Sequence, residues 1–312
     1  MKIVKLLIVL VVLGLVVGCA KQKAEAPKDK TLTFALCPKS LNNPFWTAVE
    51  DGMRAKGKEL GIKTEFVAPV EADSQKQVSM IEGLIARRIN GIAISPNDPK
   101  AVRGVISKAI AAGIPTICFD ADAPDTERIC YVGTDNTKAG EEAGRQMVKA
   151  MGGRGKYAII TGGMGAFNLN QRIAGFRKSV KAAPGMKEVA FYPCDDDEAK
   201  AHEIIESLLQ AHSDLGGIYA VGLWAANPAG KILKREGKVG KVKVVGFDTT
   251  ESTIQLVKDG SVQALIGQRP YEMGRRSVEI LNDLNQGKKP SQEIISTGID
   301  VVTKENVSKF MK

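Results

Sequence analysis

Residues 115–120, PTICFD, form an apolar run rich in β-branched side chains that ends in a carboxylate. A second run, residues 242–248 (VKVVGFD), ends in the same Phe-Asp pair, and a turn and a helical pattern follow each run. A nearly continuous apolar run of this length is typical of a strand buried on both faces of a parallel sheet. Ligands of open parallel sheets bind beyond the carboxyl ends of the strands. The two runs therefore predict two sheets, each of which brings one aspartate, Asp120 or Asp248, to a cleft.

Strand-like and helix-like segments alternate on both sides of these runs. The expected strands are residues 32–37, 63–68, 91–94, 115–120, 129–133, 156–160, 186–192, 217–220, 242–248 and 294–302. Between them lie amphipathic patterns that predict helices, of which one opens at Pro44, one at about Thr137, one at Pro228 and the last at Tyr271. Each strand followed by a helix long enough for a crossover predicts an α/β fold with doubly wound parallel sheets.

The two halves of the chain carry similar short sequences at the starts of corresponding strands. A glycine, an apolar residue and a lysine precede the second strand of each half, at residues 61–63 and 185–187. Gly-Ile opens the third strand at residues 91–92 and again at residues 217–218. This weak internal symmetry predicts two similarly wired domains within one chain.

The first residues predict a targeting segment. Lys2 and Lys5 precede an apolar run, residues 6–17, which is shorter than the roughly 20 residues that a spanning helix needs. We therefore expect a signal peptide over residues 1–18. Residues 16–19, VVGC, which overlap the end of the run, resemble a bacterial lipobox, which implies cleavage before Cys19 and a lipid on its sulfur; an ordinary signal peptide or an N-terminal anchor is the alternative. Residues 19–30 lack hydrophobic periodicity and predict a lipidated tether.

Charge and cysteine usage exclude several classes of protein. Removing residues 1–18 takes away two lysines, so the mature charge is 42 minus 35, or +7, spread over helical faces rather than gathered in a nucleic-acid patch. No metal-ligand spacing and no phosphate loop occurs, so we expect neither a metal nor a cofactor. Four cysteines follow the tether. We expect buried thiols, and one disulfide stays open as an alternative, among Cys37, Cys118, Cys130 and Cys194.

Seven motifs, in order along the chain, resemble the periplasmic sugar-binding family of ABC importers, in its ribose-binding layout. They are LNNPFW, GIAISPND, PTICFD, YVGTDN, RIAGF, VVGFDTT and IGQRP. The resemblance implies a monomeric type I periplasmic binding protein, with two doubly wound parallel-sheet domains joined by a three-segment hinge near Thr134-Asp135, Gly267-Gln268 and Gly298. One domain would hold residues 31–134 and 268–297, and the other residues 135–267 and 298–312.

Several residues combine the chemistry that a sugar site needs with a place in these motifs. Asp120 and Asp248 offer acceptors at strand ends, although each would also suit a cap on the following turn. The resemblance places further ligand contacts at Asn43, Phe45, Trp46, Arg172 and Gln268. Asn43 also fits a plain helix cap, and Trp46 also fits the buried stripe of its helix.

Four positions depart from the ribose pattern and argue against ribose as the ligand. Ser95 and Gly222 stand where that pattern has asparagine, Ala121 where it has arginine, and Asp196 where it has an aromatic residue. Smaller side chains at 95, 121 and 222 predict room for a larger or differently substituted sugar, with Ser95 still a ligand contact. We further hypothesise that Trp224 and Asn227 supply new contacts.

Together the residues and the resemblance predict a lipid-anchored extracytoplasmic protein that closes around a monosaccharide or polyol and presents it to a membrane permease, without catalysis. Three alternatives stay open. A receptor for a sugar-like signal or a nucleoside would share this site. A sugar-modifying enzyme would share the fold, although the catalytic motifs are missing. The sugar-sensing half of a repressor is disfavoured by the targeting segment.

Overall fold

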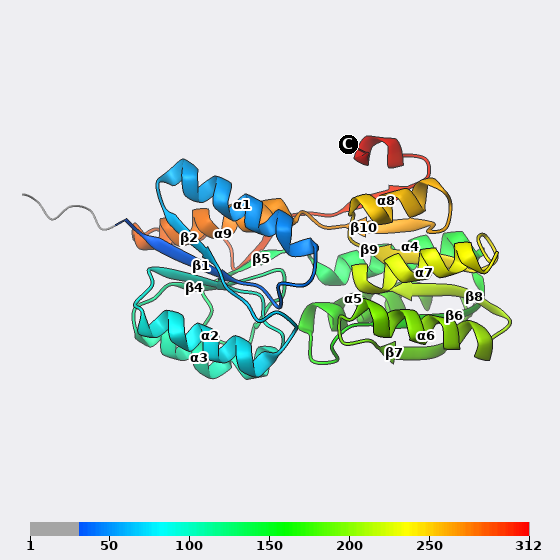
Figure 1. Cartoon of the computed structure of the whole chain (residues 1–312), viewed down its shortest axis with the longest axis horizontal. Helices are drawn as coiled ribbons and strands as arrows, with labels where there is room; N and C mark the ends of the chain where they lie inside the picture. Colours follow the sequence, from blue (N-terminus) through cyan, green and yellow to red (C-terminus); the bar gives the residue numbers. More distant parts are fainter. Residues whose placement is uncertain (1–30, 312) are drawn as a thin grey trace, which may run out of the picture. The chain divides into compact units, whose positions relative to one another are not determined.

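Two six-stranded sheets form the frame of residues 31–311, the part of the chain that this computed structural model describes (Figure 1). The first sheet is parallel throughout, in the order β11-β5-β4-β3-β1-β2. Its strands are β1 (Thr33–Cys37), β2 (Lys63–Phe66), β3 (Gly91–Ile94), β4 (Thr116–Phe119), β5 (Tyr131–Gly133) and β11 (Ile294–Ser296). The helices packed on it are α1 (Phe45–Leu60), α2 (Ser74–Ala86), α3 (Pro99–Ala111) and α9 (Pro270–Asn285). We call this sheet and its helices the first lobe.

The second sheet repeats this order as β12-β10-β9-β8-β6-β7, so the internal symmetry predicted from sequence is present. Its strands are β6 (Arg154–Thr161), β7 (Gly185–Pro193), β8 (Leu215–Ala220), β9 (Lys243–Phe247), β10 (Ala264–Gly267) and β12 (Asp300–Thr303). With it pack α4 (Asn136–Met151), α5 (Phe167–Val180), α6 (Glu198–Ala211), α7 (Leu223–Arg235), α8 (Glu251–Lys258) and the 3-10 turn η1 (Val307–Phe310). We call this the second lobe. β12 runs antiparallel to β10, an edge exception to the parallel sheets expected.

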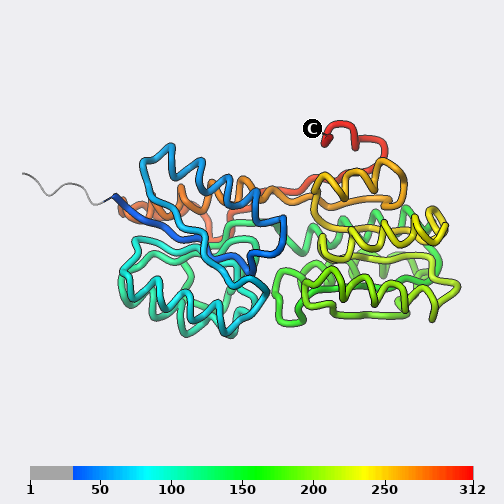
Figure 2. Tube along the Cα trace, in the orientation of Figure 1, coloured from blue at the N-terminus to red at the C-terminus, as the bar shows by residue number. Residues whose placement is uncertain are grey.

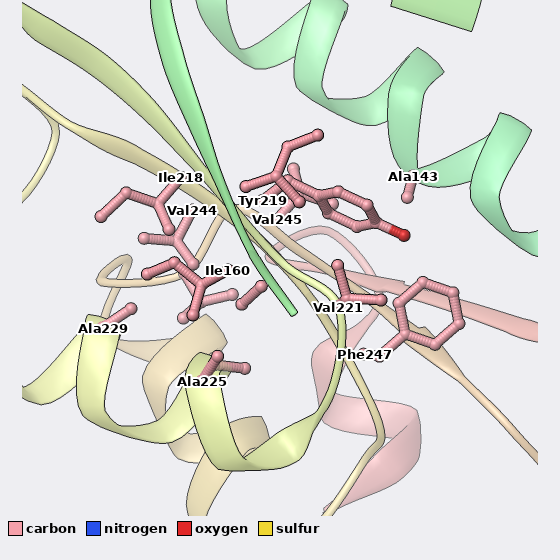
Figure 3. Close-up of a cluster of buried hydrophobic side chains, with 14 of the residues drawn as sticks. Ala143, Ile160, Ile218, Tyr219, Val221, Ala225, Ala229, Val244, Val245 and Phe247 are labelled. Carbon is pink, nitrogen blue, oxygen red and sulfur yellow. The ribbon is translucent and has the colours of Figure 1, made fainter. Parts of the chain in front are cut away.

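Each sheet is covered on both faces, which explains the continuous apolar runs of its strands. In β1, Phe34 and Leu36 pack with α1 and α9, whereas Ala35 and Cys37 pack with α2 and α3. Figure 1 shows the first helix pair above the strands of the first lobe and the second pair below them. In the second lobe, Figure 3 places strand side chains between Ala143 of α4 and the alanines of α7. The polar side chains that follow the strand ends lie outside these apolar layers and are therefore available to form a site.

The chain passes between the lobes three times, as Figure 2 traces. It passes from β5 to α4 through Thr134 and Asp135, from β10 to α9 through residues 268–269, and from β11 to β12 through residues 297–299. The single strand expected over residues 294–302 is wrong. Gly298 has a φ of 80°, a left-handed backbone that ends β11 and sends β12 to the other sheet.

A second correction concerns α7, which begins at Leu223 and not at Pro228. The proline lies inside the helix, where it lacks an N–H to donate to the preceding turn. Every residue from Leu223 to Gly230 is buried, so packing stabilises a helix that local propensity argues against. The correction moves Trp224 and Asn227 from a loop into the first turns of a helix.

In each lobe, glycines allow close packing between the helix that directly follows a crossing segment and a neighbouring helix. The two pairs are α9 with α1 and α4 with α5. A Cβ on Gly52 of α1 would lie 2.0 Å from the Tyr271 oxygen of α9, and a Cβ on Gly274 would lie 2.0 Å from the Val49 oxygen. In the second lobe, α4 and α5 are paired in the same way through Gly140. Because α1 and α5 carry site residues, this packing fixes the site to the crossing segments.

All four cysteines between residues 31 and 311 are free and buried, so the alternative of a disulfide among them is wrong. Across residues 31–311 no helix has the length and apolarity to cross a membrane. The expected signal peptide at 1–18, the expected lipid on Cys19 and the expected tether at 19–30 fall outside the described residues.

Candidate functional site

Two aspartates stand at the carboxyl ends of equivalent strands, Asp120 after β4 and Asp248 after β9. Both have a left-handed backbone, with φ of 58° and 70°, which is uncommon for a residue other than glycine. The Oδ2 atom of Asp120 accepts a hydrogen bond from Ser95 Oγ at 2.7 Å. Asp248 accepts from Gln268 Nε2 at 2.8 Å and from the Leu223 backbone N–H at 3.3 Å. Neither side chain accepts a hydrogen bond from the turn that follows its strand, so a cap on that turn does not account for them.

The carboxyl of Asp248 is held in an environment that disfavours its charge. Burial raises its pKa above the ordinary value, and the nearby Arg172 guanidinium and the Gln268 amide oppose that shift only in part. A carboxylate with a raised pKa in a buried polar pocket is typical of a functional site.

Arg172 reaches the same pocket from α5. Its Nε donates to Asn136 Oδ1 at 2.9 Å and its Nη1 to the Val221 oxygen at 3.1 Å. The guanidinium carbon lies 4.1 Å from the centre of the Phe247 ring, which adds a cation–π contact. Its Nη2 is buried and has no hydrogen-bond partner within residues 31–311. The arginine is thus fixed in place with donors left over.

The start of α1 supplies an aromatic wall. Phe45 and Trp46 pack edge to face with their ring centres 4.9 Å apart, and Trp46 also contacts the Phe119 ring at 6.1 Å. Trp46 Nε1 is buried and finds no acceptor among the described side chains and backbone. Asn43 Oδ1 accepts from the Phe45 backbone N–H at 2.9 Å, so its side chain is bonded to the first residue of α1, although Pro44 holds the N-cap position.

These residues from both lobes line one pocket, which holds about 400 Å³ of space free of protein atoms, open solvent at its mouth included. Its lining residues are Lys39, Ser40, Asn43, Phe45, Trp46, Asp120, Asn168, Leu169, Arg172, Asp196, Gly222, Trp224, Asp248 and Gln268. The structure therefore brings together the predicted residues, with Ser95 and Asn227 outside the lining. Ser95 is bonded to Asp120, and Asn227 Nδ2 donates to Glu198 Oε1 at 2.8 Å.

Four lining residues escaped the sequence analysis: Lys39, Ser40, Asn168 and Leu169. Lys39 and Ser40 directly precede the LNNPFW motif, which was the available signal. Lys39 Nζ donates to Asn168 Oδ1 at 2.9 Å across the two lobes, and a contact between residues so far apart in the chain leaves no local pattern.

The room expected from small side chains is largely refilled. A Cβ on Gly222 would lie 2.6 Å from the Trp224 ring, so the indole occupies the space in front of the glycine. Ser95 and Ala121 are fully buried and do not line the pocket. The indole thus fills the room expected at 222, and residues 95 and 121 do not border the pocket.

Gln268 links the site to the crossing segments. Its Oε1 accepts from Thr134 Oγ1 at 2.9 Å, and its Nε2 donates to Asp248. The first contact joins two of the three crossings, and the second joins them to a strand-end carboxylate. A ligand that contacts Asp248 would therefore act directly on the segments that join the lobes.

Comparisons with known proteins agree with this architecture. The sequence profile of the periplasmic binding protein domain matches residues 34–289. The ribose import binding protein of Escherichia coli K12 is 31% identical over 257 residues, which cover 82% of this chain and 86% of that protein. The ribose import binding protein of Bacillus subtilis is 29% identical over 282 residues, 90% of each. An ABC transporter solute-binding protein of Burkholderia graminis, solved in complex with D-arabinose, superimposes with a TM-score of 0.87 at 37% identity, over 91% of this chain and 100% of that one.

Proposed function

The chain belongs to the periplasmic binding protein family, and we propose that it is the substrate-binding protein of an ABC importer, with a monosaccharide or related polyol as its ligand. The relatives named above are ribose import binding proteins and a solute-binding protein solved with D-arabinose. The proposal carries the ligand class of these relatives to the pocket between the two lobes.

One observation carries the proposal: buried polar atoms without partners surround the pocket. Trp46 Nε1 and Arg172 Nη2 are donors, and Asp196 Oδ1 is an acceptor; within residues 31–311 none of the three has a hydrogen-bond partner. An unpaired buried polar group costs about 1–3 kcal/mol, so each of these atoms needs a partner that the described residues do not supply, and a bound ligand can provide it. A sugar hydroxyl both donates and accepts, and therefore satisfies donors and acceptors in one pocket.

Closure of two lobes around the ligand follows from where these groups lie. The lobes that move would be residues 31–134 with 268–297, and residues 135–267 with 298–312. Asp120 and Trp46 belong to one lobe and Arg172 and Asp248 to the other, so a ligand gains its full set of contacts only when both lobes meet it. It then stabilises the closed state by its greater affinity for that state. The closed form is the one presented to the permease.

The remaining parts of the proposal concern the setting of the protein. We place it outside the cytoplasm, anchored through a lipid on Cys19, and acting as a monomer that binds its ligand without turnover. The relatives support transport rather than catalysis, since they are import binding proteins. The apolar run and the lipobox-like residues support the anchor.

Isothermal calorimetry on the purified protein tests the function. D-ribose, D-arabinose, D-allose, their alditols, nucleosides and NAD are titrated into the parent, into Arg172→Gln, and into Arg177→Gln. Arg177 lies on the same helix but forms an exposed ion pair with Glu188, so it serves as the matched control. We expect one neutral sugar or polyol to bind the parent and the control equally, and Arg172→Gln at least tenfold more weakly. Binding of a nucleoside or NAD alone would refute the assignment.

A further inference from the structure

Asp196 lies in the pocket at a position that the family resemblance assigns to an aromatic residue. It follows β7 and Cys194, and both it and Asp195 have a left-handed backbone, with φ of 60° and 54°. Holding two successive residues other than glycine in this region costs free energy, which the surrounding structure must offset. The turn sets the Asp196 carboxylate among the pocket residues, whereas the next residue, Asp197, caps α6 through the Lys200 backbone N–H.

The Asp196 carboxylate is closely packed, but one of its oxygens has no hydrogen-bond donor. Its Oδ1 is buried, and no hydrogen-bond partner for it exists among residues 31–311. A Cβ on Gly162 would lie 1.6 Å from this atom, so only glycine at 162 leaves room for the carboxylate. Burial raises the pKa of Asp196, and the positive charge of Lys39 opposes that shift. The Gly163 backbone N–H also opposes the shift, so the Oδ1 atom is the part of this carboxylate that has no donor.

Lys39 supplies the complementary charge from the other lobe. Its side chain is buried and lines the same pocket. The ammonium has three donors, of which the bond to Asn168 Oδ1 uses one. Lys39 and Asp196 thus present donors and an acceptor to the pocket from opposite lobes, in addition to the family-motif residues.

We infer that Asp196 and Lys39 read one hydroxyl group of the ligand, which donates to Asp196 Oδ1 and accepts from Lys39 Nζ, and thereby restrict the ligand to neutral polyhydroxy compounds. The inference rests on the proposed function and narrows its substrate class. An O-methyl or deoxy group at that position cannot donate to the carboxylate. A sugar acid or sugar phosphate would add negative charge to a pocket that already holds Asp120, Asp196 and Asp248 against two cations.

The test combines protein variants with ligand analogues. Asp196→Asn keeps the size and tolerance of the left-handed backbone but removes the charge. Asp197→Asn is the matched control, because it is the neighbouring residue, is exposed, and remains a good helix cap as asparagine. The probe is whichever of D-ribose, D-arabinose, D-allose and their alditols binds the parent most tightly, with each of its monodeoxy analogues and its aldonic acid.

We expect one monodeoxy analogue to bind the parent about 10- to 100-fold more weakly than the probe, and this penalty to shrink to a few-fold in Asp196→Asn. The penalties at the other positions should be unchanged, and Asp197→Asn should match the parent throughout. Equal deoxy penalties in the parent and Asp196→Asn, or an aldonic acid that binds as tightly as the neutral probe, would overturn the inference alone. If the parent binds no sugar or polyol, the proposed function fails as well.

Discussion

Replacing Asp248 by asparagine should weaken ligand binding and at the same time stabilise the ligand-free protein at neutral pH. The side chain keeps its shape, asparagine tolerates the left-handed backbone at this position, and an amide oxygen can still accept from Gln268 Nε2. What changes is the charge, since the buried carboxylate becomes neutral.

The binding effect follows from the strength of the bonds that the carboxylate makes. A charge-assisted hydrogen bond contributes about 1.5–3 kcal/mol and a neutral one about 0.5–1.5 kcal/mol. The difference, about 1–1.5 kcal/mol, corresponds to roughly a tenfold rise in Kd. Calorimetry with the sugar that binds the parent measures it.

The stability effect has the opposite sign and depends on pH. Burial raises the pKa of Asp248 above the unfolded-state value, so its favourable contribution is complete below that unfolded value and is lost as pH rises through the folded one. Asp248→Asn and the parent should therefore be nearly equal in stability near pH 3.5, and the variant should be the more stable at pH 7. Urea unfolding of ligand-free protein at both values gives the comparison.

Asp214→Asn is the control, because the contribution of Asp214 to stability changes with pH in the opposite direction. Asp214 is exposed, and its 2.5 Å ion pair with Lys156 lowers its pKa. Its contribution is present above the ordinary carboxyl range and is lost as pH falls, and its substitution should leave Kd unchanged. If Asp248→Asn proves less stable than the parent at pH 7, or binds the sugar equally well, the account of this carboxylate is refuted.

Three further changes test other features. Gly274→Ala should destabilise the protein by about 1–3 kcal/mol in urea unfolding, because its Cβ would lie 2.0 Å from a carbonyl oxygen of α1, and unchanged stability would contradict that packing. Gly222→Asn should displace the Trp224 indole and change which sugar binds best; an unchanged ranking in calorimetry would show that the indole does not shape the pocket. Burial raises the pKa of the Cys194 thiol to about 12, so residue-resolved labelling at pH 8 should modify it only in denaturant.

Much of the frame could be predicted from sequence because its signals are local. The Phe-Asp endings at residues 119–120 and 247–248 marked the two strand ends, and the matching Gly-Ile openings marked the repeated topology. Pro228 and Gly298 show the limit of local rules. The proline lies inside a helix because its surroundings are buried on all sides, and the glycine divides one apparent strand between two sheets.

The site was harder to predict where partners come from distant parts of the chain. Asp120 and Asp248 were found because strand ends and motifs coincide there. Lys39 was missed because the hydrogen bond that holds its side chain at the pocket is made to Asn168, which lies in the other lobe. Ser95 was placed on the ligand by its motif, yet its hydroxyl is bonded to Asp120, a contact that position alone does not reveal.

At Asp120 and Asp248 the left-handed backbone makes the best residue for thermal stability different from the best residue for ligand binding. Glycine adopts this conformation without the steric cost of a Cβ, which is about 1 kcal/mol for an ordinary residue, and glycine would also remove a buried carboxylate. Directed evolution that selects only for a higher melting temperature would accordingly enrich glycine at these two positions. The selected proteins would be more stable but would no longer bind a sugar. Selection for heat resistance in this scaffold therefore has to be coupled to selection for ligand capture.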